Sequence, residues 1–371
     1  MKKFLILISL VLILFACDRF EHILEPSISN IGLSEFANSM AELFSNTNQN
    51  NFLEISFLFS DNYFNQDTTK DEKYDYFTSF FLIDPNTTFI ADNITISPSL
   101  HINWHFTATN SNHEILADTT FIDFLIKENE GFVFYGDQNN KKKVMVELFT
   151  GKWCSNCPNA EDALHELRMQ YGSRFSYVEY HFGDDELVID DPPIFYYPFA
   201  GTLPFGIVNG NSHIVYSAPS VEDVKTEIDA AITPLLQEPL LASLSNVQIN
   251  MSDTLLTGSV QIDLDPVVST DNLALVAVLM ENYNDEYLNY HDEPHHNIAL
   301  KRETIDISEL DLREPVSFEL TELNTLPQWY MDNSTGLPDD LTLVLWIQTL
   351  EIPYNQNTCA VHNVIEVQIN N

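Results

Sequence analysis

The chain has 371 residues, a formal net charge of −39 at pH 7 and a hydrophobic content of 44%. Such an acidic surface repels phosphate groups, so the composition argues against a nucleic-acid-binding protein. The length exceeds that of one ordinary domain, so we expect two or three domains.

The first residues predict an export signal. Two lysines precede an apolar run over residues 4–15, which is too short to span a membrane and is typical of a signal-peptide core. The run ends in Leu14-Phe15-Ala16-Cys17, which resembles the lipobox of bacterial lipoproteins. By that resemblance, residues 1–16 are a signal peptide, Cys17 carries the lipid, and residues 17–30 form a tether. The alternative is an ordinary secretory signal followed by a chance cysteine.

Residues 31–140 predict an α+β domain. Apolar residues at helical spacing follow Ser34, which we expect to cap a helix, and further helical stretches cover Phe52–Phe59 and Glu72–Leu82. Alternating apolar residues then predict an antiparallel sheet. This order, with the closing stretch Gly131-Phe132-Val133-Phe134-Tyr135-Gly136, resembles the nuclear-transport-factor-2-like cone fold. We expect the aromatic side chains to form a core rather than a ligand pocket.

A redox motif follows a polar bridge at residues 137–143. The apolar strand Val144–Phe149 leads into Trp153-Cys154-Ser155-Asn156-Cys157-Pro158, and a helical stripe then runs to Tyr171. Two cysteines in the first turn of a helix can form a disulfide with little strain, and helix N–H groups stabilise a thiolate. We expect Cys154 to be the attacking thiol and Cys157 to resolve the mixed disulfide.

Other chemistry at this motif is disfavoured. A zinc half-site would need a second cysteine or histidine pair, and attachment of a c-type haem needs a histidine where Pro158 stands. We therefore expect no metal and no cofactor. An inert structural disulfide remains the alternative to a redox-active pair.

The same segment resembles a known superfamily. The strand, the motif and the helix are followed by a strand at Phe175–Phe182 and by the loop and hairpin Gly201–Gly210. Together they resemble the thioredoxin-like superfamily over residues 143–237, which implies an α/β domain.

The resemblance also implies roles for particular residues. Pro204 matches the cis-proline of the superfamily, and the backbone of Leu203 before it would pair with an extended substrate peptide. Trp153 matches the aromatic residue before the first cysteine. Glu147 would take the place of the buried acid that moves protons.

A narrower resemblance covers about residues 144–371. It rests on Glu147-Leu148-Phe149-Thr150-Gly151, Cys154-Ser155-Asn156-Cys157-Pro158, Tyr180-His181 and a histidine- and arginine-containing stretch at 295–302. These resemble the twenty-eight-kilodalton outer membrane protein family of bacterial lipoproteins. The family implies a location in the outer membrane, rather than the inner membrane, facing the periplasm or the surface.

Residues 239–371 predict an all-β sandwich, because strand patterns alternate with turns rich in Asp, Asn and Pro. A cluster of metal-ligand types occurs at His291, Asp292, Glu293, His295 and His296. We expect a solvated loop there rather than a metal site. Cys359 is expected to be a buried free thiol.

Two functions are compatible with these patterns. The first is a lipid-anchored cell-envelope thiol–disulfide oxidoreductase that acts on the thiols or disulfides of exported proteins through Cys154 and Cys157. The second is an outer-membrane or surface binding lipoprotein that holds an unknown envelope partner. In the second, the thioredoxin fold is a scaffold and its disulfide is structural.

Overall fold

The computed structural model describes residues 32–65, 68–96, 100–128, 131–190, 192–193, 196–197, 202–214, 220–252, 254–323 and 340–369. The chain divides into two compact units, whose main boundary lies between Gly136 and Asp137. Phe64, Asn65, Leu100 and His101 group with the C-terminal unit. Within the described ranges, no helix combines the length and the apolar character that a membrane span requires.

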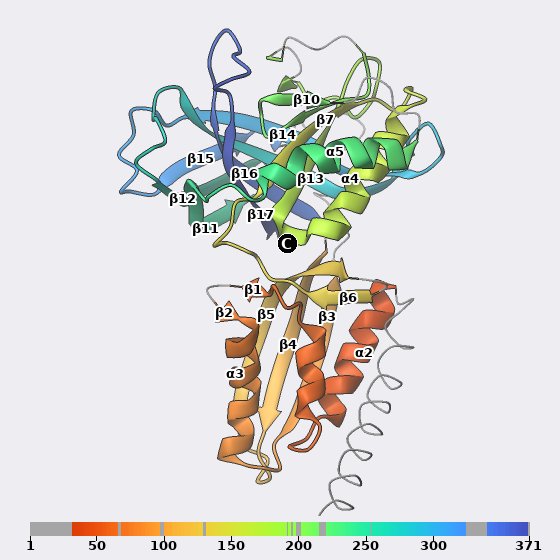
Figure 1. Ribbon diagram of the computed structural model, residues 1–371, viewed down its shortest axis with the longest axis vertical. Helices are drawn as coiled ribbons and strands as arrows, with labels where there is room; N and C mark the ends of the chain where they lie inside the picture. Colours follow the sequence, from red (N-terminus) through yellow and green to blue (C-terminus); the bar gives the residue numbers. More distant parts are fainter. Residues whose placement is uncertain are drawn as a thin grey trace, which may run out of the picture. The chain divides into compact units, whose positions relative to one another are not determined.

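In the N-terminal unit, helices precede an antiparallel sheet (Figure 1). The helical elements are α2 (Leu33–Asn46), the 3-10 helix η1 (Phe52–Leu58) and α3 (Lys70–Ile83), and the short strand β2 (Thr68–Thr69) precedes α3. The short strand β1 (Phe64–Asn65) groups with the C-terminal unit. The four-stranded sheet has the order β3-β4-β5-β6. Its strands are β3 (Thr88–Ile96), β4 (His101–Thr109), β5 (Ile115–Glu128) and β6 (Gly131–Phe134). The sequence predicts this order, in which the helices precede the sheet.

The first helix begins slightly earlier than predicted. Gly32, not Ser34, is the N-cap of α2. The Gly32 N–H donates to Glu35 Oε2 at 3.3 Å. The acidic side chain thus satisfies an N–H that has no partner within the helix, which allows the helix to start before the serine.

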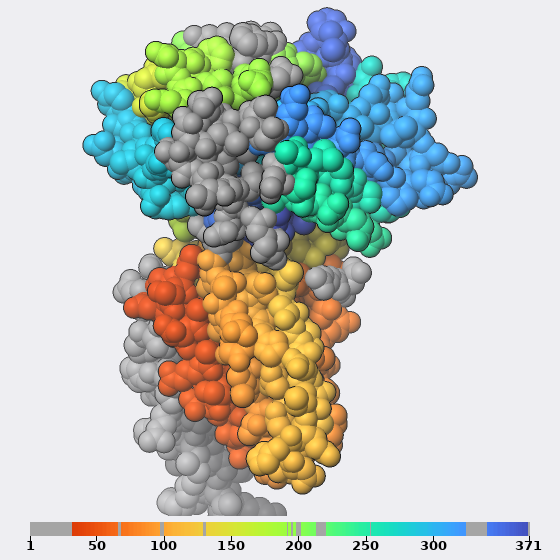
Figure 2. All heavy atoms as spheres, turned by 180° about the vertical axis from the view of Figure 1, so that it is seen from behind, coloured from red at the N-terminus to blue at the C-terminus, as the bar shows by residue number. Residues whose placement is uncertain are grey.

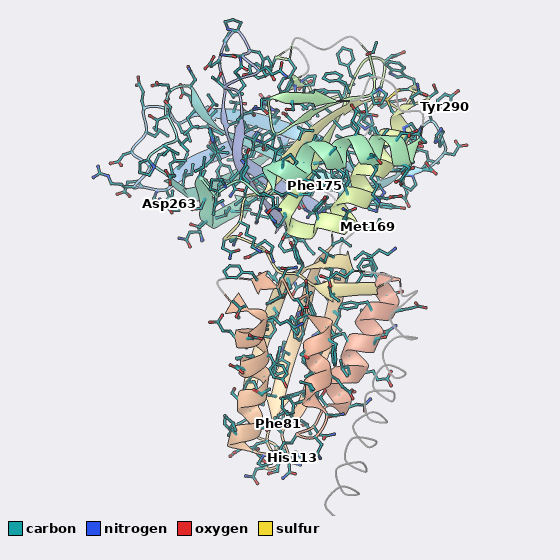
Figure 3. All side chains as sticks on the ribbon, in the orientation of Figure 1. Phe81, His113, Met169, Phe175, Asp263 and Tyr290 are labelled. Carbon is teal, nitrogen blue, oxygen red and sulfur yellow. A yellow bond between two sulfur atoms is a disulfide. The ribbon has the colours of Figure 1, made fainter. Side chains whose placement is uncertain are left out.

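Aromatic side chains form the core of this unit. The Phe44 ring lies 5.4 Å from that of Phe77 and 5.3 Å from that of Trp104, measured between centroids. Helices and sheet therefore pack through rings, as expected for a filled core. At one end, Asp84 Oδ2 accepts a hydrogen bond from the Ser111 N–H at 2.7 Å. This bond joins the turn after α3 to the β4–β5 hairpin, near the labelled Phe81 and His113 (Figure 3).

The C-terminal unit opens with a β-α-β crossover. The elements in chain order are β7 (Val144–Thr150), α4 (Cys157–Tyr171), the 3-10 helix η2 (Gly172–Arg174), β8 (Phe175–His181), β9 (Phe205–Val208), β10 (Ser212–Ile214) and α5 (Val221–Leu235). β7 and β8 are parallel, whereas β9 is antiparallel to β7 and β10 to β9. Residues such as Val146, Leu164 and Ile228 share one core, so α4 and α5 cover the same face of these strands.

One eight-stranded sheet, of order β10-β9-β7-β8-β14-β13-β16-β17, continues through this unit. Its C-terminal strands are β13 (Leu273–Leu288), β14 (Pro294–Asp306), β16 (Leu341–Thr349) and β17 (Val361–Ile369). β14 joins the two halves, because Ile298 pairs in parallel with Glu179 of β8. The segments 143–237 and 239–371, which the sequence predicts as separate domains, therefore share a sheet and one compact unit.

A second sheet packs on the C-terminal part of the first. Its three antiparallel strands have the order β11-β12-β15. They are β11 (Ala242–Met251), β12 (Leu255–Leu264) and β15 (Val316–Thr321). Val260 and Phe318 from this sheet share a core with Leu275 and Leu343 from the larger sheet, which is a sandwich arrangement. Figure 2 shows the β11–β12 region (teal) beside the β15 region (blue).

The segment before β7 is part of this fold rather than a solvated bridge. Lys142 and Lys143 are buried. Lys142 Nζ donates to the carbonyl oxygens of Val361 and His362, each at 2.7 Å, and the Lys143 N–H donates to Asn363 Oδ1 at 3.1 Å. Burial lowers the pKa of both lysines to about 8. These hydrogen bonds connect the segment before β7 to β17.

Candidate redox site and an adjacent buried polar cluster

The two motif cysteines form a disulfide at the start of α4, with their Cα atoms 5.4 Å apart. Cys154 lies in the turn after β7, and its N–H donates to the Gly151 carbonyl at 2.8 Å. Cys157 is the first residue of α4. Cys154 is 6% exposed and Cys157 is fully buried, so only Cys154 reaches the surface.

The start of α4 suits an anion. Asn156 is the N-cap and makes no side-chain capping bond, Pro158 lies in the first turn, and no acidic residue occupies that turn. The N–H groups at a helix start lack intrahelical partners and carry a partial positive charge. This field favours a thiolate over a thiol when the disulfide is open.

Trp153 borders the disulfide and lies against the loop after β8. Its side chain is 52% exposed, and Nε1 donates to the Phe182 carbonyl at 3.2 Å. A Cβ atom at Gly183 would lie 3.3 Å from the indole, and Gly183 has a φ of +86°. Glycine therefore permits both the backbone turn and the close approach of the ring.

Pro204 lies at the same end of the sheet as the motif. The Leu203–Pro204 peptide bond is cis. Phe205 of β9 pairs with Phe149 of β7, which places the preceding proline beside the end of β7, where the motif turn begins. Pro204 is buried and Leu203 is partly exposed.

Glu147 faces away from α4. Its neighbours Val146 and Leu148 alternate around it in β7, and both pack in the core under α4 and α5. Glu147 Oε2 accepts a hydrogen bond from the Tyr197 hydroxyl. Burial raises the pKa of this carboxyl, although the charge of Arg302 opposes the rise. These contacts hold Glu147 on the far face of the sheet.

The buried acid on the helix side is Glu161, which the sequence reasoning missed. It lies one helical turn after Cys157 and is 3% exposed. Its carboxylate accepts hydrogen bonds from the Thr150 hydroxyl and, at 3.0 Å, from Asn289 Nδ2. Burial raises the pKa of Glu161, but His295 and Thr150 outweigh burial and the pKa is lowered. The four-residue spacing places Glu161 on the same helix face as Cys157, and this spacing could have identified it from the sequence.

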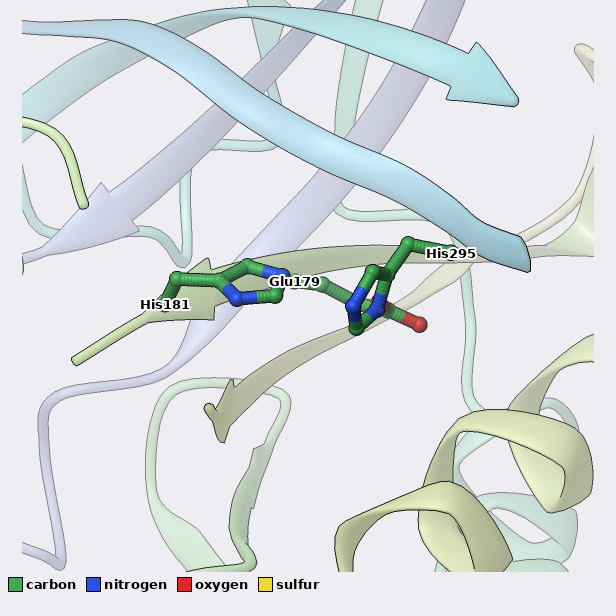
Figure 4. A group of neighbouring side chains, drawn as sticks. All are labelled: Glu179, His181 and His295. Atoms are coloured by element: carbon green, nitrogen blue, oxygen red, sulfur yellow. The ribbon is translucent and has the colours of Figure 1, made fainter. Parts of the chain in front are cut away.

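A buried polar cluster lies next to Glu161, formed by Glu179 and His181 of β8 and His295 of β14 (Figure 4). All three are at most 1% exposed. His295 Nδ1 lies 3.5 Å from Glu161 Oε2 and 3.9 Å from Glu179 Oε2. Burial, together with the charge of Glu161, raises the pKa of Glu179 well above its usual value. Several ionisable groups thus share one dry site.

Asp185 links this cluster to the motif turn. Its Oδ2 accepts from His181 Nδ1 at 2.8 Å and from the Lys152 N–H at 2.7 Å. Burial opposes ionisation of Asp185, but its hydrogen bonds prevail and lower its pKa to about 2. One ionised carboxylate therefore holds both the histidine ring and the turn that carries Cys154.

The histidine-rich stretch is not the solvated loop that the sequence predicts. β14 begins at Pro294, so His295 and His296 belong to a strand. This strand lies between β8 and β13 and is covered on both faces, which buries His295. The ring of His296 stacks on that of His165 with centroids 4.2 Å apart. Only the part before the strand, with His291, stays exposed.

The other two cysteines are separate from this site. Cys359 is a buried free thiol, as predicted, and its Sγ lies 3.0 Å from the Tyr196 hydroxyl oxygen. Cys17, the predicted lipidation site, lies outside the described residues.

No protein-family model matches the chain, and no curated protein matches it. Among solved structures, the chain is similar to HBP35 of Porphyromonas gingivalis, with 14% identity and a TM-score of 0.43, over 62% of this chain and 76% of that one. It is also similar to protein AGR_C_4864 from Agrobacterium tumefaciens, with 15% identity and a TM-score of 0.39, over 61% of this chain and 94% of that one. These similarities assign neither a family nor an activity.

Proposed function

We propose that the chain is a lipid-anchored thiol–disulfide oxidoreductase of the cell envelope, which acts on exported proteins through Cys154 and Cys157. The observation that carries the proposal is the disulfide at the start of α4, of which only Cys154 reaches the surface. The crossover β7-α4-β8, followed by β9, β10 and α5, supports a thioredoxin-like domain. The cis bond before Pro204 lies at the same end of this domain.

In the proposed reaction, the oxidised pair accepts two electrons from a substrate dithiol. A substrate thiolate attacks Cys154 Sγ, the Cys154–Cys157 bond breaks, and Cys157 leaves as a thiolate. The second substrate thiolate then attacks the substrate sulfur of the mixed disulfide and releases Cys154. The substrate leaves with a disulfide, the protein keeps two thiols, and the protons come from the substrate thiols. The reverse sequence reduces a substrate disulfide.

Neighbouring groups would position the substrate and the protons. Leu203 is partly exposed and offers backbone groups for an extended peptide. The exposed indole of Trp153 would border that peptide. Glu161, rather than Glu147, is the buried acid on the same side of the sheet as α4.

Trapping of mixed disulfides tests this reaction. Cys157→Ser should accumulate covalent complexes with exported proteins on non-reducing gels, because the resolving thiol is missing. Cys154→Ser should trap none. Cys359→Ser removes a buried thiol outside the site and should match the wild type.

A binding lipoprotein with a structural disulfide is the second candidate. It is favoured by the burial of Cys157 and the slight exposure of Cys154. The binding function becomes the preferred one if Cys157→Ser traps no partner and if the Cys154–Cys157 disulfide of the folded wild type resists reduction by dithiothreitol.

The proposed location rests on the lipobox and on the resemblance to outer membrane lipoproteins. We place the protein in the outer membrane, anchored by lipid on Cys17, with the N-terminal unit as a cone-like domain. Cys17→Ala should move the protein from the membrane fraction to the soluble fraction. Unchanged fractionation of that variant would contradict the anchor.

A further inference from the structure

The cluster beside Glu161 has the chemistry of a metal site. Ligand atoms of Glu179, His181 and His295 lie within 4.8 Å of one another. Both carboxylate oxygens of Glu179, Nε2 of His181 and both ring nitrogens of His295 have no hydrogen-bond partner among the described residues. A buried polar atom without a partner is costly, so folded proteins almost always satisfy such atoms. Figure 4 shows the three side chains lying next to one another.

The surroundings of Glu179 favour a cation. Glu161 Oε2 lies 3.5 Å and Glu179 Oε2 lies 3.9 Å from His295 Nδ1. Glu161 also accepts hydrogen bonds from Thr150 and Asn289, whereas neither carboxyl oxygen of Glu179 has a hydrogen-bond partner among the described residues. A bound cation would provide this buried carboxyl group with the partner that it lacks.

We propose that Glu179, His181 and His295 bind a divalent first-row transition-metal ion of the zinc type. Two imidazole nitrogens and a carboxylate are a ligand set for such ions, whereas calcium and magnesium prefer oxygen ligands alone. Ligand atoms of a tetrahedral ion with bonds of about 2.0–2.1 Å lie roughly 3.3 Å apart. Side-chain movements of about 1 Å or less would close the observed separations.

His181 is already oriented for this role. Asp185 accepts a hydrogen bond from Nδ1, and a carboxylate ionised at neutral pH can only accept, so Nδ1 carries the ring proton. The lone pair is then on Nε2, which is the atom without a partner. A histidine held by a carboxylate in this manner is a recurrent feature of metal sites.

Complete burial indicates a structural ion. The ligands come from β8 and β14, the two strands that join the halves of the large sheet, so the ion would cross-link this junction. The site is distinct from the disulfide and does not depend on the proposed redox function.

Metal content tests the proposal directly. The full chain, with its disulfide intact so that Cys154 and Cys157 cannot ligate, should be purified from zinc-supplemented cells and, separately, stripped by a chelator and incubated with Zn²⁺. We expect about one zinc per chain in at least one preparation, and a higher melting temperature than the stripped protein, because the ion binds the folded state. Less than about one tenth of an equivalent in both, with no change in melting temperature, would overturn the proposal.

Variants locate the ion. Glu179→Gln and His295→Gln should lose the zinc, and Asp185→Asn should weaken binding by about 10- to 100-fold. His296 is partly buried and Glu281 is buried, and both lie outside the cluster, so His296→Gln and Glu281→Gln should bind zinc as the wild type does. Retention of a full equivalent by Glu179→Gln and His295→Gln would overturn the assignment.

X-ray absorption of the zinc-loaded wild type covers the case in which a variant does not fold. Only nitrogen and oxygen neighbours at about 2.0–2.1 Å, with an imidazole signature, are expected. A sulfur neighbour at about 2.3 Å would place the ion on a cysteine and overturn the proposal.

Discussion

Single residues hold the surroundings of the disulfide in place. Trp153 is half exposed, yet its indole is fixed by a hydrogen bond to the Phe182 carbonyl. The ring rests against Gly183, where a Cβ atom would lie 3.3 Å from it, closer than an ordinary contact. The shape of the surface beside Cys154 therefore depends on Gly183, a glycine in the loop after β8.

Gly183→Ala should lower the free energy of unfolding by about 1–3 kcal/mol, because alanine disfavours a φ of +86° and its Cβ would lie 3.3 Å from the indole. Urea unfolding measures the loss. In a Trp153→Ala background the loss should be smaller, since only the backbone penalty remains. Equal stability of Gly183→Ala and the wild type would show that the loop relaxes freely.

For single residues, the sequence predicts the disulfide better than it predicts the side chains around it. The spacing of Cys154 and Cys157 after an apolar strand was sufficient to predict their pairing and their place at a helix start. The acid was assigned to Glu147, because sequence does not tell which face of β7 lies under α4. Glu161 was missed because it reads as one more polar residue on a solvated helix.

Among the elements, β17 shows how a strand can carry a pH-dependent contribution to stability. Burial lowers the pKa of His362 to about 4 from its ordinary 6.5, and the charge of Lys142 adds to the shift. His362 Nε2 lies 2.9 Å from the Thr349 hydroxyl oxygen of β16. The folded strand therefore favours the neutral ring.

Between pH 6.5 and about 4, unfolded chains bind a proton at His362 that folded chains do not. This histidine should therefore make stability fall as the pH falls through that range, with no further loss below it. His362→Gln keeps a side chain able to hydrogen-bond to Thr349 and should show a shallower decrease. Urea midpoints of both proteins from pH 7 to pH 4 test this, and parallel curves would contradict it.

Strands with clear alternation or long apolar runs were predicted closely. The sequence predicts strands at Leu255–Leu264 and Val361–Ile369, which are the bounds of β12 and β17. The predicted strands Val144–Phe149, Val316–Leu320 and Leu341–Leu350 differ from β7, β15 and β16 by one residue at one end. β11 and β14 were not predicted, because polar residues interrupt both. His295 and Asn297 of β14 are buried because the strand lies between β8 and β13, and no local sequence pattern reveals that later arrangement.

For the whole molecule, the main finding is that the disulfide segment and the sandwich form one unit. Arg168 of α4 makes an ion pair with Glu366 of β17 at 2.6 Å, and both side chains are less than 5% exposed. This pair connects residues on the two sides of the predicted boundary near residue 238.

Arg168→Met should destabilise the C-terminal unit by about 3–5 kcal/mol, because it leaves Glu366 buried without its partner. Adding Glu366→Leu should recover part of the loss, since the buried carboxylate left without its arginine is then removed. Hydrogen exchange of the single variant should show α4 and β17 losing protection together. Loss confined to α4 would mean that the two segments open independently.

The boundary at Gly136 lies close to the predicted end of the first segment, near residue 140, where composition changes. No corresponding signal separates 143–237 from 239–371, and the sequence resemblance supplied that division. Resemblance to a compact superfamily does not reveal whether one edge of its sheet is extended by later strands.

The position of β14 has a consequence for the order of folding. β8 is translated long before β14, so its outer edge has no partner until most of the chain has been made. An unpaired strand edge readily pairs with another chain. Such long-range pairing is slow to form. The interval before β14 docks is therefore the time at which a newly made copy most needs protection from aggregation. In a fragment ending after α5, the outer edge of β8 would stay unpaired.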